Sequence, residues 1–222
     1  MFDIVSATVG IVGTSPLWLV ALVGIELSDP GPVFYAARRV GKDNREFRMW
    51  KFRSMRVARD AGESSLRADG DRIFPFGRFI RASKIDELPQ LLNILNGTMS
   101  VIGPRPASVD QVEITRAGRN AVASEVPCGL SGPSALYDYI VGDAVTDEAE
   151  YEEKVLPTRL ALDVYYVRTM GAAYDLKMIW WTLVCIAYVM RGKVPQKILD
   201  ELLASAETVG EDSPEFNRGA RR

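Results

Sequence analysis

The longest run of hydrophobic residues lies near the start of the chain. Between Ile4 and Ile25 no side chain carries a charge. About 20 apolar residues are enough to cross the roughly 30 Å hydrocarbon core of a bilayer as a helix. However, Ser15 and Pro16 interrupt the middle of the run, and a proline there removes a backbone donor and clashes with the preceding turn. The pattern therefore predicts an apolar helix broken at Pro16, in which Thr14 and Ser15 can bond the freed carbonyl groups.

Two membrane arrangements of this helix agree with the pattern. Each half would contain about ten residues and extend about 15 Å, so neither half would cross a bilayer alone. Two halves at an angle would enter one leaflet and leave it on the same side, which defines a re-entrant helix. The alternative is an ordinary spanning helix with a proline kink. We expect the re-entrant form over residues 1–28.

A hairpin is predicted after this helix. The sequence from Ser28 to Pro32 contains the residues that interrupt regular structure. Residues 33–40 and 46–52 then form two runs separated by the turn-forming residues 41–44, and this arrangement predicts two antiparallel strands. Residues 57–72 are polar and predict a mobile loop, and a helix is expected to begin near Pro75.

The C-terminal part contains a second apolar segment, from Leu176 to Met190. It is shorter than a spanning helix should be. Its aromatic residues, Trp180, Trp181 and Tyr188, indicate a helix at the membrane interface, and a core helix is the alternative. Beyond Lys197 the chain becomes polar, and we expect a flexible tail.

These patterns predict an α+β fold that is predominantly helical. The expected organisation is a re-entrant membrane helix over residues 1–28, a cytosolic catalytic domain with interfacial helices over 29–198, and a flexible tail over 199–222. The chain has 222 residues, 47% of them apolar and 9% aromatic, which argues against a disordered protein and leaves room for one sizeable core.

Composition then limits the chemistry. The chain contains no histidine, which removes the usual general base and the commonest metal ligand. Catalysis would have to use carboxylates, Arg, Lys, Tyr, Ser or a hard cation. The two cysteines, Cys128 and Cys185, lie far apart in the sequence, so neither a zinc site nor a disulfide framework is indicated.

Positive charge is concentrated in the hairpin, although the net charge is only −2. Nine Lys and Arg residues fall within residues 38–59, and residues 38–60 contain only three acidic residues. Interleaved basic and aromatic residues can bind nucleic acid. The chain is acidic overall, with a pI of about 5.4, and the stretch follows an apolar segment, so anionic lipid headgroups are the favoured partner and no nucleic acid is expected.

Two adjacent carboxylates, Asp86 and Glu87, are the strongest candidates for catalysis. Asp86 could simply cap a helix, with Pro89 in its first turn. Capping does not explain Glu87, nor the nearby Arg81 and Arg105, of which the latter lies between two prolines. Because successive helical residues do not share a face, one acid could approach a phosphorus atom and the other a divalent cation. The arginines would bind phosphate oxygens.

Taken together, these motifs resemble the bacterial sugar transferases, which are small monotopic polyprenyl-phosphate phosphoglycosyl transferases. The resemblance covers most of the chain. Members of that family commonly carry Lys or Arg before the first helix, whereas this chain reads Met1-Phe2-Asp3. The blocks that carry the resemblance are Ser15-Pro16, Gly31-Pro32-Val33-Phe34, Arg39-Val40-Gly41, Lys51-Phe52-Arg53-Ser54-Met55, Gly77-Arg78-Phe79-Ile80-Arg81, Asp86-Glu87-Leu88-Pro89-Gln90-Leu91, the run from Gly97 to Pro106, and Asp163-Val164-Tyr165-Tyr166-Val167.

The resemblance implies a two-step reaction. Asp86 would attack the β-phosphorus of a UDP-sugar, release UMP and carry the phosphosugar, which an undecaprenyl or related polyprenyl phosphate would then accept. Glu87 would hold Mg²⁺, and Arg81 and Arg105 would contact phosphate. The product would start the synthesis of a glycoconjugate, such as an exopolysaccharide, at the cytoplasmic face of the bacterial inner membrane.

Four further residues match the family's motifs and are possible pocket residues: Lys51, Arg53, Asp163 and Tyr166. An Asp in an amphipathic helix is more often solvated or ion-paired, so a structural role for Asp163 is the alternative. Two other functions agree with the sequence. The first is a Mg²⁺-dependent nucleotide-sugar hydrolase that needs no lipid acceptor. The second is a non-catalytic membrane adaptor, in which Asp86 is only a helix cap. No motif specifies the sugar.

Overall fold

The computed structural model describes residues 1–57, 72–145 and 147–211. The α-helices are α1 (Phe2–Ser28), α2 (Pro75–Ala82), α3 (Gln90–Leu95), α4 (Val112–Thr115), α5 (Pro133–Ile140), α6 (Glu148–Lys154), α7 (Leu156–Thr169), α8 (Ala172–Val189) and α9 (Gln196–Glu211). The strands are β1 (Phe34–Val40), β2 (Glu46–Phe52), β3 (Ser100–Ile102), β4 (Ala107–Ser108) and β5 (Gly129–Ser131). The protein is mostly helical with little sheet, as the sequence predicts. Most of the predicted mobile loop at 57–72 lies outside the described residues.

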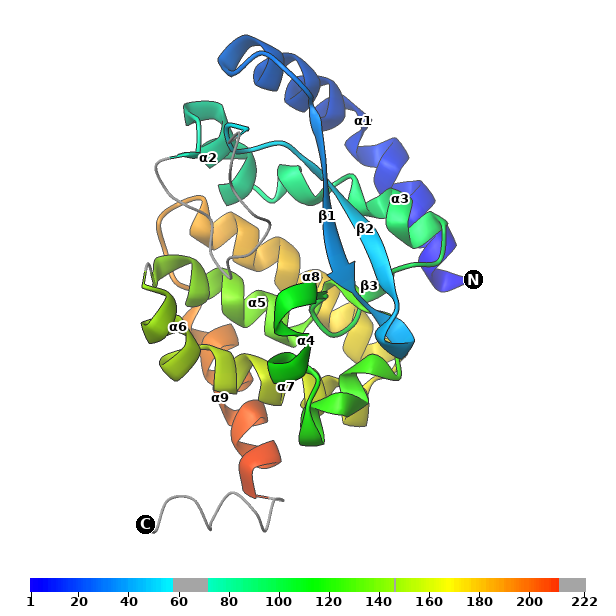
Figure 1. The fold of residues 1–222 in the computed structure, drawn as a ribbon, viewed down its shortest axis with the longest axis vertical. Helices are drawn as coiled ribbons and strands as arrows, with labels where there is room; N and C mark the ends of the chain where they lie inside the picture. The colour runs from blue at the N-terminus through cyan, green and yellow to red at the C-terminus, as the bar shows by residue number, and fades with distance from the viewer. Residues whose placement is uncertain (58–71, 146, 212–222) are drawn as a thin grey trace.

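Helix α1 runs along one side of the molecule, and its two halves point in different directions (Figure 1). The helix is nevertheless continuous across Pro16, so it is bent there and not broken as the sequence analysis expected. Proline leaves the carbonyl of Val12 without its usual backbone donor. The Ser15 hydroxyl donates to that carbonyl at 2.8 Å, and the Thr14 hydroxyl donates to the Gly10 carbonyl at 2.6 Å. The predicted role is confirmed for Ser15, whereas Thr14 bonds a carbonyl that Pro16 does not free.

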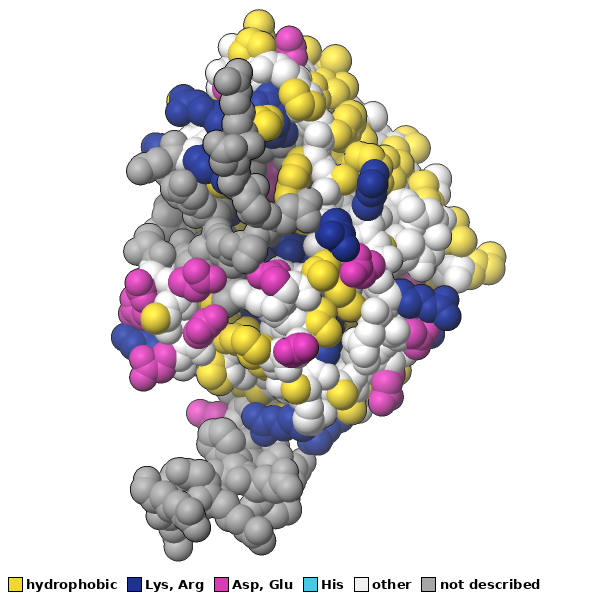
Figure 2. All heavy atoms as spheres, in the orientation of Figure 1, with side chains coloured by type: hydrophobic (Ala, Val, Ile, Leu, Met, Phe, Trp, Pro, Cys, Tyr) yellow, Lys and Arg dark blue, Asp and Glu magenta, His cyan; other side chains and the backbone are white. Residues whose placement is uncertain are grey.

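One face of α1 packs against the rest of the protein, and the other is exposed. Ala7 joins a cluster with residues of α3 and the hairpin. Ala21 and Ile25 pack against Phe52 and Phe74. Many of the remaining apolar side chains of α1 are exposed, and they form a hydrophobic edge in Figure 2. The buried face therefore contains Ala7, Ala21 and Ile25, whereas most of the other large apolar side chains of α1 point outward.

The predicted hairpin is present. Strands β1 and β2 pair antiparallel from Phe34 opposite Phe52 to Val40 opposite Glu46, and β4 extends this sheet on the other side of β1. Strands β3 and β5 form a separate parallel pair. The return of the chain from β3 to β4 brings Arg105 between the two sheets, next to the end of the hairpin.

Helices α5, α7, α8 and α9 enclose the largest hydrophobic core. Helix α8 buries Met178 and Cys185 on one face and exposes Leu176, Trp180 and Tyr188 on another, so it has a core face as well as an exposed aromatic one. By length and composition alone, α1 and α8 are the two helices within the described ranges that are apolar enough to cross a membrane.

The expected flexible tail is wrong for residues 199–209. Helix α9 continues through this segment, and Leu202, Ala206 and Val209 are buried against α7 and its neighbours. With Ile198 they form one face at helical spacing. The sequence analysis missed it because Ala206 and Val209 stand alone among polar residues. Residues 212–222 lie outside the described part of the chain.

Asp86 does not begin a helix, contrary to the sequence prediction. Lys84 adopts a left-handed backbone conformation with φ of 57° and starts a short 3-10 turn, η3 (Ile85–Glu87). Helix α3 begins only at Gln90, and Gly97 ends it with φ of 78°. Neither η3 nor α3 has a side-chain cap. Capping therefore does not account for Asp86.

Close packing between α2 and the chain after β2 gives the first prediction. A Cβ atom on Gly77 would collide with the carbonyl oxygen of Ser54. Gly77→Ala should therefore lower the free energy of unfolding by about 1–3 kcal/mol, as overpacking does. The measurement is urea unfolding in detergent, followed by circular dichroism.

The control for this prediction is Gly13→Ala. A Cβ atom there meets nothing within 4 Å, and alanine favours the helix by about 0.5–1 kcal/mol. Equal stability of the two variants would show that the contact between α2 and Ser54 is looser than the structure indicates.

Candidate active site

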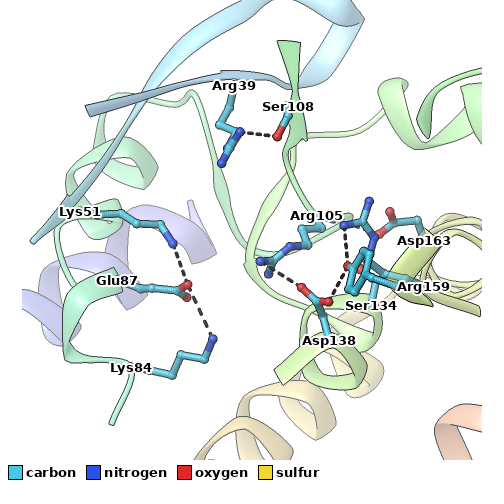
Figure 3. Close-up of polar contacts among 11 residues, drawn as sticks. Arg39, Lys51, Lys84, Glu87, Arg105, Ser108, Ser134, Asp138, Arg159 and Asp163 are labelled. Carbon is cyan, nitrogen blue, oxygen red and sulfur yellow. Dashed lines mark hydrogen bonds and ion pairs between the residues drawn. The ribbon is translucent and has the colours of Figure 1, made fainter. Parts of the chain in front are cut away.

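A cleft open to solvent lies between the hairpin, η3, the loop after β3 and helices α5 and α7. Its polar lining consists of Arg39, Lys51, Glu87, Gln90, Arg105, Ser108, Gln111, Asp138 and Arg159. Two charged groups face each other across it in Figure 3: Lys51, Glu87 and Lys84 on one side, and Arg105 with Asp138 on the other. The hairpin contributes Lys51 and Arg39, so residues distant in sequence meet at this site.

Glu87 is largely buried between two lysines. Lys51 Nζ lies 3.0 Å from Glu87 Oε1, and Lys84 Nζ lies 3.7 Å from the same atom. Burial alone would raise the pKa of Glu87, but Lys51, Lys84 and Arg105 outweigh it and hold the pKa far below its usual range. Glu87 is therefore a permanent anion at the wall of the cleft.

Asp86 is more deeply buried than Glu87, and its pKa is shifted in the opposite direction. Its side chain is 4% exposed, and its Oδ1 atom has no hydrogen-bond partner among the described residues. Burial raises its pKa to about 6, against the attraction of Lys51 and with a smaller contribution from the charge of Glu87. At neutral pH, Asp86 is thus mostly an ionised but poorly solvated carboxylate.

Buried hydrogen bonds fix the loop that carries Arg105. Asp163 Oδ1 accepts a hydrogen bond of 2.9 Å from the backbone amide of Arg105 and another of 2.5 Å from the Ser134 hydroxyl. Arg116 donates to the carbonyl of Arg105 at 2.8 Å, and the Tyr166 hydroxyl donates to the carbonyl of Ile102 at 3.1 Å. These bonds therefore fix the loop at Ile102, where β3 ends, and at Arg105.

The Arg105 side chain is oriented by a second set of buried groups. Its guanidinium lies 3.1 Å from Asp138 Oδ2. Asp138 Oδ1 accepts a hydrogen bond of 2.6 Å from the Tyr151 hydroxyl, which accepts one of 3.1 Å from Arg159. Burial would raise the pKa of Asp138, but Arg105 and Arg159 lower it below its usual value. Asp138 is therefore an ionised partner that holds Arg105 at the cleft.

The structure separates the sequence-predicted residues into two groups. Lys51, Glu87 and Arg105 line the cleft. Asp86 and Arg81 do not line it, although the charge of Arg81 lowers the pKa of Asp86. The other predicted pocket residues have structural contacts instead.

Asp163 and Tyr166 hold the Arg105 loop from behind, as described above. Arg53 pairs with Asp29 at the end of α1 and donates to the carbonyl of Pro32 at 2.5 Å. The motif match was therefore a poor guide to which of these side chains reach the cleft. Asp163 is buried and hydrogen-bonded, not solvated as the alternative interpretation had it, and its contacts are structural.

Sequence reasoning missed six polar residues of the cleft: Arg39, Gln90, Ser108, Gln111, Asp138 and Arg159. Arg39 and Gln90 belong to blocks that the sequence analysis singled out without giving them a role. Arg159 lies four residues before Asp163 in α7, which places both on one helix face. That spacing was the available signal. Nothing in the sequence around Asp138 distinguishes it.

The donor atoms at the dyad fit a hard divalent cation. Asp86 and Glu87 offer carboxylate oxygens, and Asp86 Oδ1 is buried without a partner. Mg²⁺ is usually bound by one or two carboxylates together with substrate phosphates. Among the described residues, no cluster of three or more Asp, Glu, Cys or His side chains forms a complete protein site. A cation here would therefore be shared with a substrate.

Comparisons with known proteins agree with this geometry. The family model described as bacterial sugar transferase matches residues 1–188. The chain is 36% identical over 191 residues to the UDP-N-acetylgalactosamine-undecaprenyl-phosphate N-acetylgalactosaminephosphotransferase of Aeromonas hydrophila, covering 82% of this chain and 41% of that protein. It is 33% identical over 184 residues to the UDP-glucose:undecaprenyl-phosphate glucose-1-phosphate transferase of Escherichia coli K12, covering 82% and 38%.

A shorter relative matches over most of its length. The exopolysaccharide production protein ExoY of Rhizobium meliloti is 32% identical over 204 residues, which is 84% of each chain. In contrast, the chain spans only about two fifths of the Aeromonas and Escherichia proteins.

The raised pKa of Asp86 gives the second prediction. Because the folded protein binds this proton more tightly than the unfolded chain, stability should fall as the pH rises from about 4 to 6, and then level off. An asparagine at position 86 cannot ionise, so the Asp86→Asn variant should not lose stability over this pH range. In EDTA at pH 8 the variant should exceed the unmutated protein by on the order of 1–3 kcal/mol in free energy of unfolding, and the difference should vanish near pH 4.

The matched control is Asp110→Asn at an exposed position, which should show no such trend. The free energy of unfolding is measured by urea unfolding at several pH values. A difference between Asp86→Asn and the unmutated protein that does not change with pH would contradict the burial of an ionised Asp86.

Proposed function

The chain belongs to the bacterial sugar transferase family, and we propose that it transfers a phosphosugar from a UDP-sugar to a polyprenyl phosphate such as undecaprenyl phosphate, releasing UMP. The observation that carries this proposal is the pairing of an unpartnered buried carboxylate, Asp86, with a permanently charged one, Glu87, beside a cleft lined by Lys and Arg. Such a cleft suits a diphosphate. The relatives whose names specify UDP-sugars and undecaprenyl phosphate give the substrate classes.

The proposed reaction has two steps, with Asp86 as the nucleophile. A carboxylate oxygen of Asp86 forms a bond to the β-phosphorus, and the bond from that phosphorus to the bridging oxygen breaks, so that UMP departs with the electron pair. An oxygen of the polyprenyl phosphate then attacks the same phosphorus. The bond to Asp86 breaks, the carboxylate is restored, and a polyprenyl-diphosphate sugar is formed. One covalent intermediate divides the exchange into two displacements.

Several side chains would support this chemistry. A poorly solvated carboxylate is a stronger nucleophile than a hydrated one, and the positive charges of Lys51, Lys84 and Arg81 keep Asp86 ionised despite its burial. Because Asp86 does not line the cleft, side chains at the wall would have to move before a phosphate could reach it. Arg105 would bind phosphate oxygens in the orientation that Asp138 gives it.

Glu87, with Asp86, would hold Mg²⁺. When bound, the cation would neutralise charge on the diphosphate and on the departing phosphate. Lys51 and Lys84 would then exchange part of their contact with Glu87 for contacts with the substrate.

We also propose that α1 is re-entrant and that the catalytic domain lies at one membrane face, the cytoplasmic one. Both ends of α1 contact the same domain. Asp3 Oδ1 accepts hydrogen bonds from the Ser100 hydroxyl at 2.9 Å and the Val101 amide at 3.0 Å. At the other end, Asp29 forms an ion pair with Arg53.

A spanning arrangement would conflict with these contacts. A helix of 27 residues extends about 40 Å, and the domain follows it over its whole length. If α1 crossed a bilayer, the charged hairpin beside it would enter the hydrocarbon core. A helix lying with only its outer face in lipid avoids this, and that face carries exposed Val9, Val12 and Leu19.

The third prediction tests the reaction. Purified protein with Mg²⁺ should release UMP from one member of a panel of UDP-sugars, and turnover should require undecaprenyl phosphate and cease in EDTA. Asp86→Asn should lower the rate at least about 10³-fold, since it removes the nucleophile. Without lipid, mass spectrometry should locate one phosphosugar on the peptide containing Asp86.

Other outcomes would assign a different role. An adduct on Glu87 would reverse the roles of the two acids. Sustained turnover without lipid would indicate the nucleotide-sugar hydrolase. Full activity of Asp86→Asn in its cellular pathway would favour the membrane adaptor. Glu87→Gln is the companion variant, because it leaves Asp86 in place and should slow the formation of the adduct without preventing it.

The fourth prediction concerns topology. Single cysteines introduced at Phe2, Ser28 and the exposed domain position Glu152 should all react with an impermeant maleimide from the same membrane side, since both native cysteines are buried. Labelling of intact spheroplasts and inverted vesicles makes the comparison. Reaction of Phe2→Cys and Ser28→Cys from opposite sides would establish a spanning helix.

A further inference from the structure

Arg159 is a buried arginine that reaches the cleft without a carboxylate of its own. It projects from α7, is 7% exposed, and lines the cleft. One of its terminal nitrogens donates to the Tyr151 hydroxyl at 3.1 Å. Its Nε atom has no hydrogen-bond partner among the described residues. A buried guanidinium with an unused donor is expensive to maintain unless a ligand completes it.

The charges around Arg159 do not balance. The buried cluster behind the cleft contains three guanidinium groups, of Arg105, Arg116 and Arg159, and two carboxylates, of Asp138 and Asp163. Burial raises the pKa of Asp163, against the attraction of Arg116 and Arg159, which weakens the negative side further. Within this set of described residues the positive charges outnumber the negative ones, and Arg105 also acts on Glu87 across the cleft.

Only some of these arginines can supply that excess charge to a ligand. Arg116 does not line the cleft, and it holds the carbonyl of Arg105. Arg39 approaches from the hairpin, where it donates to the Ser108 hydroxyl. Arg105, Arg159 and Arg39 thus belong to three different segments, and all three line the cleft. Figure 3 shows Arg105 and Arg159, which form an arginine wall, across from Glu87, while Arg39 extends from the hairpin at the top of the view.

We propose that Arg159, together with Arg39 and Arg105, binds the phosphate that remains with the departing nucleotide. This inference rests on the proposed function. The transferred phosphate must lie at Asp86, so the other phosphate of the diphosphate lies farther along the cleft, towards the arginine wall. Arg159 compensates the charge of that phosphate, both in the donor and in the leaving nucleoside monophosphate.

A purely structural role for Arg159 makes a different prediction about stability. If Arg159 served mainly to hold Tyr151 and Asp138, its removal would destabilise the fold. If it is an uncompensated charge kept for a ligand, Arg159→Met should unfold at the same or a higher temperature, because two guanidinium groups and two carboxylates would remain. Tyr151 would still donate to Asp138.

The experiment measures anion binding by isothermal titration calorimetry, using inorganic pyrophosphate, UMP and geranyl phosphate as separate probes. Arg159→Gln and Arg159→Met should weaken pyrophosphate and UMP binding at least about tenfold, while Arg159→Lys recovers part of the loss. Binding of geranyl phosphate should change less than twofold, because it represents the lipid acceptor. Arg191→Gln, at an exposed position beyond α8, is the control, and circular dichroism verifies folding of every variant.

Three results would overturn the proposal: no pyrophosphate binding by the unmutated protein, unchanged UMP affinity in a folded Arg159→Gln variant, or a loss confined to geranyl phosphate. Failure of the proposed function would look different. If pyrophosphate binding depends on Arg159 but no UDP-sugar is turned over, the anion site stands and the proposed donor is wrong. If transfer occurs and Arg159→Gln binds pyrophosphate and UMP normally, only this inference fails.

Discussion

Burying a carboxylate removes its hydration, and the free energy lost must be recovered from opposite charges or hydrogen bonds. The cleft shows three solutions to this constraint. Glu87 is neutralised by two lysines, and Asp163 is satisfied by a backbone amide and a hydroxyl. Asp86 is left partly unsatisfied. The protein completes the first two and leaves the third incomplete, which is why Asp86 is the nucleophile in the proposed reaction.

Several of the residues that support the cleft do not line it. Asp163 and Tyr166 fix the loop of Arg105 from behind, and Asp138 fixes its side chain. In the proposed reaction, a chain without histidine must obtain its reactivity from the placement of ordinary acids and bases, and placement depends on such buried partners. This explains why motif residues far from the cleft are as necessary to the arrangement as those within it.

Sequence reasoning succeeded where the signal is local or periodic. The hairpin, the start of α2 and the Ser15 hydroxyl that bonds the carbonyl freed by Pro16 follow from strand patterns, proline chemistry and side-chain donors. It failed where tertiary contacts determine the ends of a helix or the position of a side chain. The left-handed Lys84 delays α3 to Gln90, and α9 continues because α7 offers a surface for Ala206 and Val209. Likewise, the position of Arg53 at the end of α1, and of Asp138 beside Arg105, depends on segments that meet only in the folded chain.

The ion pair between Arg53 and Asp29 connects the end of α1, the helix proposed to lie in the membrane, to the hairpin. Arg53 lies two residues after Lys51, the lysine that contacts Glu87. A displacement of the end of α1 would therefore be transmitted along one short stretch of backbone to the catalytic dyad. Such mechanical coupling would make the dyad sensitive to how deeply the helix sits in lipid. Protein away from a membrane would then assemble its dyad poorly, which would protect the nucleotide sugar from being consumed where no acceptor is present.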